Sequence, residues 1–228
     1  MIATAAPEPA METTDRFFSP ADLEAIQTAV REAEGRTSGE IVPYVVERSD
    51  EYPTAAWKGA ALGALLGPMV ALALHRWTDL WGWPLSLWIA LPAPLGGAAG
   101  YLLALLGPVR RWMAGEPTLD ARARRRAAAA FLETEVFRTR ERTGILLFVS
   151  LFERRVVLLA DSGIHQKVDD TAWEEITRRL ARGIREGRPG PAMVEAIRAC
   201  GELLERHGVE RQADDQDELT NELRRERD

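Results

Sequence analysis

The stretch that decides the fold runs from Trp57 to Trp112 and has the sequence WKGAALGALLGPMVALALHRWTDLWGWPLSLWIALPAPLGGAAGYLLALLGPVRRW. It contains two uncharged apolar segments, 59–74 and 80–109, and the short break between them has tryptophans on or beside it at positions 77, 81 and 83. An α-helix rises about 1.5 Å per residue and a bilayer's hydrocarbon core is roughly 30 Å thick. The second segment is therefore long enough to cross a bilayer, and the first is long enough with its flanks. Two such segments in succession predict a membrane-embedded helical hairpin.

The alternative is a pair of buried core helices, because a chain of 228 residues can build a large core in water. A core helix of a soluble protein usually keeps a polar stripe, and neither apolar segment has one. Lys58 and Arg76, each beside a tryptophan, flank the first segment. Such pairs are typical of membrane interfaces. We therefore favour two transmembrane helices at about 57–77 and 84–107.

Small residues recur at every fourth position in both apolar segments: Gly59, Gly63 and Gly67 in the first, and Gly96, Gly100 and Ala104 in the second. Such ridges let helix backbones approach closely in lipid, which predicts that the two helices pack on each other. The alternative is that glycine and alanine are simply common in membrane helices.

Two further features of the apolar segments concern their shape and role. Pro92 and Pro94 predict a kink in the second helix. Neither segment contains Asp, Glu, Lys or Arg, which ion and proton pathways require. The hairpin is therefore predicted to be an anchor rather than a transport path.

Cations next to the apolar segments predict the orientation. The connecting loop offers only Arg76, whereas the outer flanks carry Arg48, Lys58, Arg110 and Arg111, followed by Arg122, Arg124, Arg125 and Arg126. Because Lys and Arg stay on the cytoplasmic side, we expect a two-pass protein of the inner (cytoplasmic) membrane with both termini and the soluble domain in the cytoplasm. The same cations would attract anionic lipid headgroups. A net charge of −6 disfavours nucleic acid as a partner.

The cysteine content and the N-terminus agree with a cytoplasmic domain. Cys200 is the only cysteine, so no disulfide can form within the chain. Residues 1–16 have neither a positively charged start nor a continuous apolar run, which predicts that no signal peptide is cleaved.

The two arms outside the hairpin contain alternating helix and strand signals. The pattern predicts a helix at 20–34 and a strand at 40–47 before the hairpin, then a helix at 119–140, strands at 144–150 and 155–160, and helices at 170–185 and 191–207. One strand before the hairpin and two after it are too few for two sheets. We therefore expect the arms to complete one mixed sheet in a single α/β domain.

This interpretation divides the chain into five parts. They are a disordered N-terminus at 1–16, the first part of the α/β domain at 17–54, the transmembrane hairpin at 55–112, the second part of the domain at 113–208, and a charged mobile tail at 209–228.

Several short patterns in the two arms together resemble a known family. They are Ser38–Val42, Ala127–Phe131, Arg142–Phe152, Arg155, Asp161 with Gly163 and Ile164, and Trp173. The arrangement resembles the TPM domain family, in the variant with an inserted transmembrane helical hairpin. The resemblance covers about 17–208, and 142–164 is its most specific part.

The resemblance implies a three-layer α/β/α sandwich around a small mixed sheet, interrupted here by the two-helix transmembrane hairpin. Some members of the family bind calcium, some plant lumenal members are described as acid phosphatases, and others assist membrane complexes in photosystem repair or receptor function. Family membership therefore does not fix the chemistry. A cytoplasmic location, where calcium is scarce, argues against a calcium role in this chain.

Asp161 is the strongest single candidate for a functional side chain. It follows an apolar strand and precedes a Ser-Gly turn, at a sheet edge where α/β domains place ligands. With Asp169 and Asp170 it would form a site for Ca²⁺ or Mg²⁺, and Glu40 would face the same edge unless it is solvated. The alternative, which we favour, is that Asp161 closes a turn and Asp170 caps a helix.

Signatures of catalysis are sparse. The chain has no G-x-S-x-G, P-loop, C-x-x-C or H-E-x-x-H pattern, and His165 is the one histidine near Asp161. The favoured hypothesis is a non-enzymatic, membrane-anchored accessory protein that binds a divalent ion or another membrane or membrane-associated protein. The alternative is a metal-dependent phosphatase at the carboxylate site around Asp161.

Overall fold

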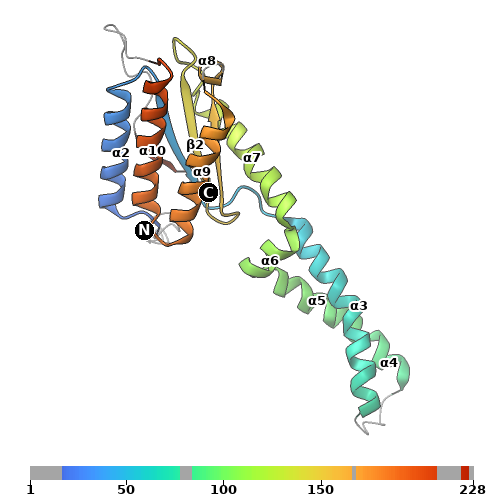
Figure 1. Ribbon diagram of the computed structural model, residues 1–228. Coiled ribbons are helices and arrows are strands. Elements are labelled where there is room, and N and C mark those ends of the chain that lie inside the picture. Colours follow the sequence, from blue (N-terminus) through green and yellow to red (C-terminus); the bar gives the residue numbers. More distant parts are fainter. Residues whose placement is uncertain (1–16, 78–83, 166–167, 210–221, 226–228) are drawn as a thin grey trace, which may run out of the picture. The chain divides into compact units, whose positions relative to one another are not determined.

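The computed structural model describes residues 17–77, 84–165, 168–209 and 222–225. The chain forms two compact units, one made of Met1–Ser49 with Ala123–Asp228 and the other of Asp50–Arg122. We call them the α/β unit and the hairpin unit (Figure 1).

A mixed sheet forms the centre of the α/β unit. Its strands are β1 (Glu40–Val46), β2 (Gly144–Ser150), β3 (Arg155–Ala160) and the two-residue β4 (Arg224–Arg225). Their order is β3-β2-β1-β4, with β1 parallel to β2 and β4, and β2 antiparallel to β3. The arms before and after the hairpin unit therefore meet in one sheet, as predicted.

Helices cover both faces of this sheet. On one face lie α2 (Pro20–Glu34), α9 (Asp170–Arg185) and α10 (Pro189–Arg206), and on the other lies the part of α7 (Glu116–Glu133) that begins at Ala123. The short α8 (Ser162–His165) follows β3. The predicted three-layer α/β/α sandwich is confirmed.

Alternation along the strands explains why their sequences are continuously apolar. In β2, Leu147 packs in the cluster with α2, α9 and α10, while the neighbouring Leu146 and Phe148 pack in the cluster with α7. Successive side chains point to opposite faces of a sheet, so a strand covered on both faces has no polar side.

Pro43 in β1 shows why a proline is tolerated inside this sheet. The N–H of Glu40 points toward β2 and donates to the Thr143 carbonyl, whereas the N–H of Ile41 points away and donates to the buried Glu34 carboxylate at 3.0 Å. By alternation, the backbone nitrogen of Pro43 also points away from β2, toward the short β4. Proline therefore removes no donor from the main ladder.

Helix ends agree with the predictions in part. Ser19 caps α2 through a capping box with Asp22, and Pro20 begins the helix. In contrast, α7 begins at Glu116 and ends at Glu133, not at 140, and Glu135 has a positive φ of 54°. A non-glycine residue in this region of φ ends a helix, and composition alone did not indicate it.

The charged C-terminal segment contains a feature that its composition did not predict. Arg224 and Arg225 form β4 beside Tyr44 and Val45 of β1. Leu223 packs against the core, although most of the segment lies outside the described residues.

The hairpin unit contains α3 (Pro53–Trp77), α4 (Leu85–Ala90), α5 (Pro92–Ala104) and α6 (Gly107–Ala114). The boundary between α4 and α5 lies at Leu91, directly before the first of the two prolines that predicted a kink, although Leu91 itself keeps helical φ and ψ of −79° and −42°. Two helices, Pro53–Trp77 and Ser86–Ala104, are long and apolar enough to cross a membrane, and only 11% and 12% of their apolar windows are buried. They are therefore not the buried core helices of the alternative interpretation.

The small-residue ridges of α3 and α5 lie against each other. A Cβ atom added at Gly63 would collide with the backbone carbonyl of Gly96, and one added at Gly100 would collide with that of Gly59. Glycine is required here because the two backbones touch. The prediction that the two ridges pack on each other is confirmed within the hairpin unit.

Candidate functional site

Asp161 lies where β3 ends, and its carboxylate is buried, with 6% of the residue exposed. One oxygen, Oδ1, accepts the backbone N–H of Ser162 at 2.6 Å and its hydroxyl at 3.2 Å. The other, Oδ2, lies 3.0 Å from Nε of Arg142 in an ion pair. Oδ1 is therefore hydrogen-bonded within the turn, whereas the buried Oδ2 is paired with the charge of Arg142 and accepts no hydrogen bond from the residues that the structure describes.

Arg142 comes from the loop before β2 and is itself held in place. It has a positive φ of 58°, its Nη1 donates to the Phe137 carbonyl at 3.2 Å, and its guanidinium lies 5.8 Å from the centre of the Phe137 ring. Its carbonyl accepts the N–H of Gly163 at 3.0 Å, and a Cβ at Gly163 would collide with that carbonyl. These contacts hold the loop before β2 and the turn after β3 together.

This arrangement bears on whether Asp161 suits a metal ion. A divalent cation at Oδ2 would lie beside the charge of the Arg142 guanidinium, which opposes binding. The donor set at Asp161 therefore does not fit Ca²⁺ or Mg²⁺ while this ion pair is formed.

The other predicted metal ligands, Asp169 and Asp170, lie at the start of α9. Asp169 is the N-cap, and its side chain accepts the N–H of Thr171 at 3.4 Å. The cap was expected at Asp170, which instead is the first helical residue, so the N-cap lies one residue earlier than predicted. The side chains of Asp170 and His165 lie outside what the structure describes.

Metal ligation by Asp161, Asp169 and Asp170 stays a prediction. Within residues 17–77, 84–165, 168–209 and 222–225, no group of three or more His, Cys, Asp or Glu residues is placed to hold a metal ion.

The position of Asp161 in the sheet differs from the expected ligand edge. Its N–H donates to the Gly144 carbonyl at 2.9 Å, so it lies beside the first residue of β2. Because β3 runs antiparallel to β2, the end of β3 meets the amino ends of β1 and β2. Ligand sites in α/β sheets lie at the carboxyl ends of parallel strands. Glu40, the first residue of β1, lies at the same amino end as Asp161 and is buried rather than solvated.

A second buried carboxylate, which the sequence analysis missed, lies at the carboxyl ends of β1 and β2. Glu153 is fully buried in the turn between β2 and β3. It accepts the N–H of Ser49 at 3.0 Å and the hydroxyl of Ser150, which in turn accepts the Ser49 hydroxyl at 2.9 Å. The sequence did contain a signal for this site, namely an acidic residue between two continuous apolar strands. The contacts of Glu153 hold the turn between β2 and β3 against the end of β1.

These features define a class of protein. It is a three-layer α/β/α sandwich with a small mixed sheet, its sequence is interrupted by an apolar helical hairpin, and an Arg–Asp ion pair joins the loop before β2 to the end of β3. Residues 112–203 match a family model described as TPM domain. The resemblance seen in the sequence is confirmed for this part.

A solved structure supports the same fold. The chain is similar to the BA42 protein of the psychrophilic bacterium Bizionia argentinensis, determined by NMR, with a TM-score of 0.57 and 18% sequence identity. The alignment covers 92% of this chain and 96% of that chain, and at this identity it shows the fold alone. A search of curated proteins found no match.

Proposed function

We propose that this protein is a membrane-anchored accessory protein whose hairpin unit spans the inner (cytoplasmic) membrane and whose TPM domain binds another protein beside the bilayer. The observation that carries this proposal is the exposed apolar surface of the two long helices. Leu65 in α3 and Leu95 in α5 are each 66% exposed, and most other large apolar side chains of these helices are also exposed. Soluble monomers rarely expose apolar patches of this extent.

The interior of the hairpin unit supports an anchoring role. The contact between α3 and α5 consists of glycine and alanine, and no Asp, Glu, Lys or Arg lies in 59–74 or 85–109. Transport of ions or protons requires such groups within the span. The cations that flank the hairpin favour both arms on the cytoplasmic side.

Binding of a partner is favoured over catalysis because two buried carboxylates of the domain, Asp161 and Glu153, serve the fold. The Asp161 carboxylate is engaged by Arg142 and Ser162, and the Glu153 carboxylate by two serines. A phosphatase needs a nucleophile or a set of metal ligands that is available to the substrate.

A matched pair of arginine substitutions tests the anchor. Leu65 in α3 and Leu132 in α7 are almost equally exposed, at 66% and 64%. In a bilayer, Leu65→Arg would cost about 2.5–3.5 kcal/mol, whereas Leu132→Arg in water would change little. We expect the unsubstituted protein to stay in the membrane pellet after alkaline extraction. The Leu65→Arg variant should leave less protein in this pellet, whereas the Leu132→Arg variant should leave as much as the unsubstituted protein. A carbonate-soluble protein, or equal behaviour of the two variants, would refute the anchor.

The orientation is tested with one epitope tag at each terminus. Protease added to spheroplasts should leave both tags intact, and protease added to inverted membrane vesicles should remove both. Tags on opposite sides of the membrane would contradict the two-pass topology.

The phosphatase alternative has its own test. Purified protein with Mg²⁺, Ca²⁺ or Mn²⁺ should not hydrolyse para-nitrophenyl phosphate above background. Turnover that disappears in Asp161→Ala, while the variant stays folded, would replace the accessory role with catalysis.

A further inference from the structure

A groove follows one edge of the sheet in the α/β unit. Among the described strands, β3 is the terminal one on this side. The groove has a volume of about 470 Å³, and β3 residues 156–160 form its floor. Trp173 and Thr177 of α9 line it, together with Arg124 of α7. Helices from both layers, α9 and α7, thus lie beside the edge strand β3.

The backbone of β3 has unused hydrogen-bonding capacity along this groove. Asp161 faces β2, because its N–H donates to the Gly144 carbonyl. By alternation, the peptide groups of Val156, Leu158 and Ala160 face outward. Across the part of the chain that the structure describes, these outward groups have no strand partner. An edge of this kind is a template for a further strand.

The side chains of β3 make this edge unusual. Natural edge strands are commonly protected by inward-pointing charges, prolines or bulges. After Arg155, its first residue, β3 continues as Val-Val-Leu-Leu-Ala at 156–160, and it pairs with β2 without a bulge. The edge is therefore suited to accept an extended peptide.

The charge around the groove selects the kind of peptide. Where β3 begins, the same edge is lined by Arg124, Arg154, Arg155, Arg178 and Arg185, and the one carboxylate in this lining, that of Glu174, pairs with Arg178 at 3.9 Å. This concentration of positive charge contrasts with the net charge of −6 of the whole chain. Electrostatic complementarity therefore favours an acidic partner.

Trp173 adds a polar group at the wall of the groove. The residue is 7% exposed, and its Nε1 makes no hydrogen bond to any residue that the structure describes. A buried tryptophan N–H usually finds an acceptor. A bound segment that brings a carbonyl oxygen to this wall would supply one.

We propose that the edge of β3 binds an acidic, extended segment of a protein partner, which adds to the sheet as a further strand. The inference rests on the proposed partner-binding function but not on the membrane anchor. A second copy of this chain is disfavoured as occupant because it would bring the same arginines against themselves. Lipid headgroups would use the arginines and leave the outward N–H groups of β3 unused.

The test begins with selection of random ten-residue peptides on the full-length protein in detergent micelles. We expect the selected peptides to be rich in Asp, Glu and β-branched residues. Leu158→Pro removes one outward N–H and leaves the ladder with β2 in place, so it should weaken the selected peptides about tenfold or more. Leu158→Ala keeps the N–H and controls for the lost side chain. Ala160→Pro repeats the test at a small residue, and circular dichroism checks that each variant is folded.

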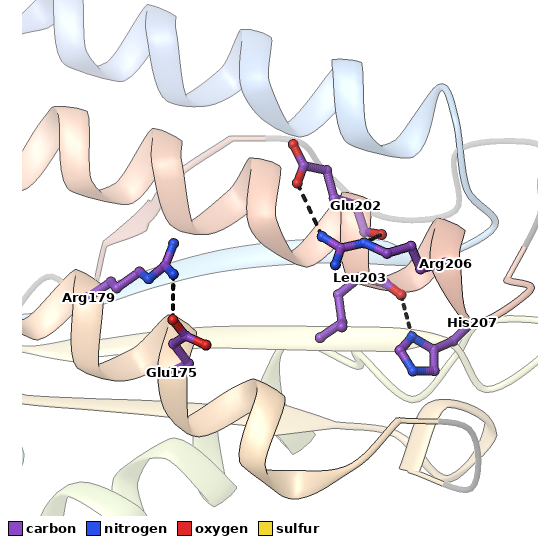
Figure 2. A network of polar contacts seen from close by, with 6 residues as sticks. All are labelled: Glu175, Arg179, Glu202, Leu203, Arg206 and His207. Carbon is purple, nitrogen blue, oxygen red and sulfur yellow. Dashed lines mark hydrogen bonds and ion pairs between the residues drawn. The ribbon is translucent and has the colours of Figure 1, made fainter.

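A pair of charge reversals tests the arginines. Arg178→Glu with Arg185→Glu should weaken binding about tenfold or more and reduce its dependence on salt. The control is Arg179→Glu with Arg206→Glu. These two side chains are each 69% exposed and pair with Glu175 and Glu202 (Figure 2). Neither arginine lines the groove. The control should bind as the unsubstituted protein does.

Three outcomes would overturn the proposal. The first is the absence of any selected peptide whose binding Leu158→Pro reduces. The second is a concentration-dependent dimer that Leu158→Pro abolishes, which would assign the edge to a second copy. The third is binding to phosphatidylserine vesicles that the Arg178 and Arg185 reversals abolish and Leu158→Pro does not change, with no acidic peptide selected. The first two results do not depend on whether the hairpin unit anchors the protein, and comparison with neutral phosphatidylcholine vesicles separates the contribution of the hairpin unit from the third.

Discussion

The α/β unit and the hairpin unit use apolar residues in opposite ways. In the α/β unit the largest apolar side chains are buried, and Phe148 in β2 is fully enclosed. In the hairpin unit the large side chains, such as Leu65 and Leu102, are exposed, and glycines occupy the interface. Water drives large apolar groups inward, whereas in lipid only close packing holds helices together. The contrast indicates that the two units are adapted to different solvents.

The largest effect is expected from emptying the core of the α/β unit. Phe148→Ala removes a ring that stacks on Tyr44 at a centroid distance of 5.9 Å, and it should destabilise this unit by about 3–5 kcal/mol. Hydrogen exchange with mass spectrometry of the full chain in micelles would follow the two units separately. Exchange should rise in β1, β2 and α7 but not in the hairpin unit. Leu132→Ala, at an exposed position of α7, is the control, and equal effects of the two changes would contradict the assigned core.

The converse change enlarges a residue in the hairpin unit. A side chain at Gly63 collides with the Gly96 carbonyl, so Gly63→Leu should force α3 and α5 apart at a cost of about 1–3 kcal/mol. Ala61→Leu, on an exposed position of the same helix, should have little effect. The stability of the α/β unit should stay unchanged in both variants.

An engineered disulfide between α3 and α5 would report directly whether these two helices separate. A Cβ at Gly97 would lie 3.4 Å from the Cβ of Ala64, near the range that a disulfide requires. In a Cys200→Ser background, the pair Ala64→Cys and Gly97→Cys should therefore crosslink readily. Adding Gly63→Leu should slow the crosslink. Crosslinking at an unchanged rate would show that the glycine contact does not hold the helices together.

A smaller effect is expected at the turn between β2 and β3. Glu153→Ala leaves the N–H of Ser49 and the hydroxyl of Ser150 without their acceptor, which should cost about 1–3 kcal/mol in the α/β unit. Glu153→Gln keeps an acceptor oxygen and should cost less. Chemical denaturation of both variants measures the difference, and equal costs would mean that the charge rather than the hydrogen bonds matters.

Local patterns predicted the elements of this fold better than they predicted its polar contacts. The strands at 144–150 and 155–160 have the predicted bounds, because continuous apolar runs ended by polar turns mark buried strands. The one-sheet architecture followed from the number of strands. The glycine spacing predicted the contact between α3 and α5, since a repeat of four residues marks one helix face.

The contacts that the sequence did not predict join residues far apart in the chain. The ion pair of Arg142 with Asp161 depends on the antiparallel return of β3, which places the end of one strand beside the start of another. Glu153 and Ser49 meet only because β1 lies beside β2. Such pairings depend on topology and register, which periodicity along one segment does not encode.

The smallest expected effect concerns Cys200, which is fully buried in α10. Burial disfavours the thiolate and raises the pKa of this thiol from 9.0 to about 12. In the native protein at pH 8 the thiol should therefore react with a disulfide reagent far more slowly than in urea. The unfolded thiol loses its proton near pH 9 while the folded thiol keeps it, so this residue should lower stability as the pH rises from about 9 toward 12. Cys200→Ala should remove that part of the alkaline slope, and rapid native labelling at pH 8 would show that α10 opens more easily than its burial indicates.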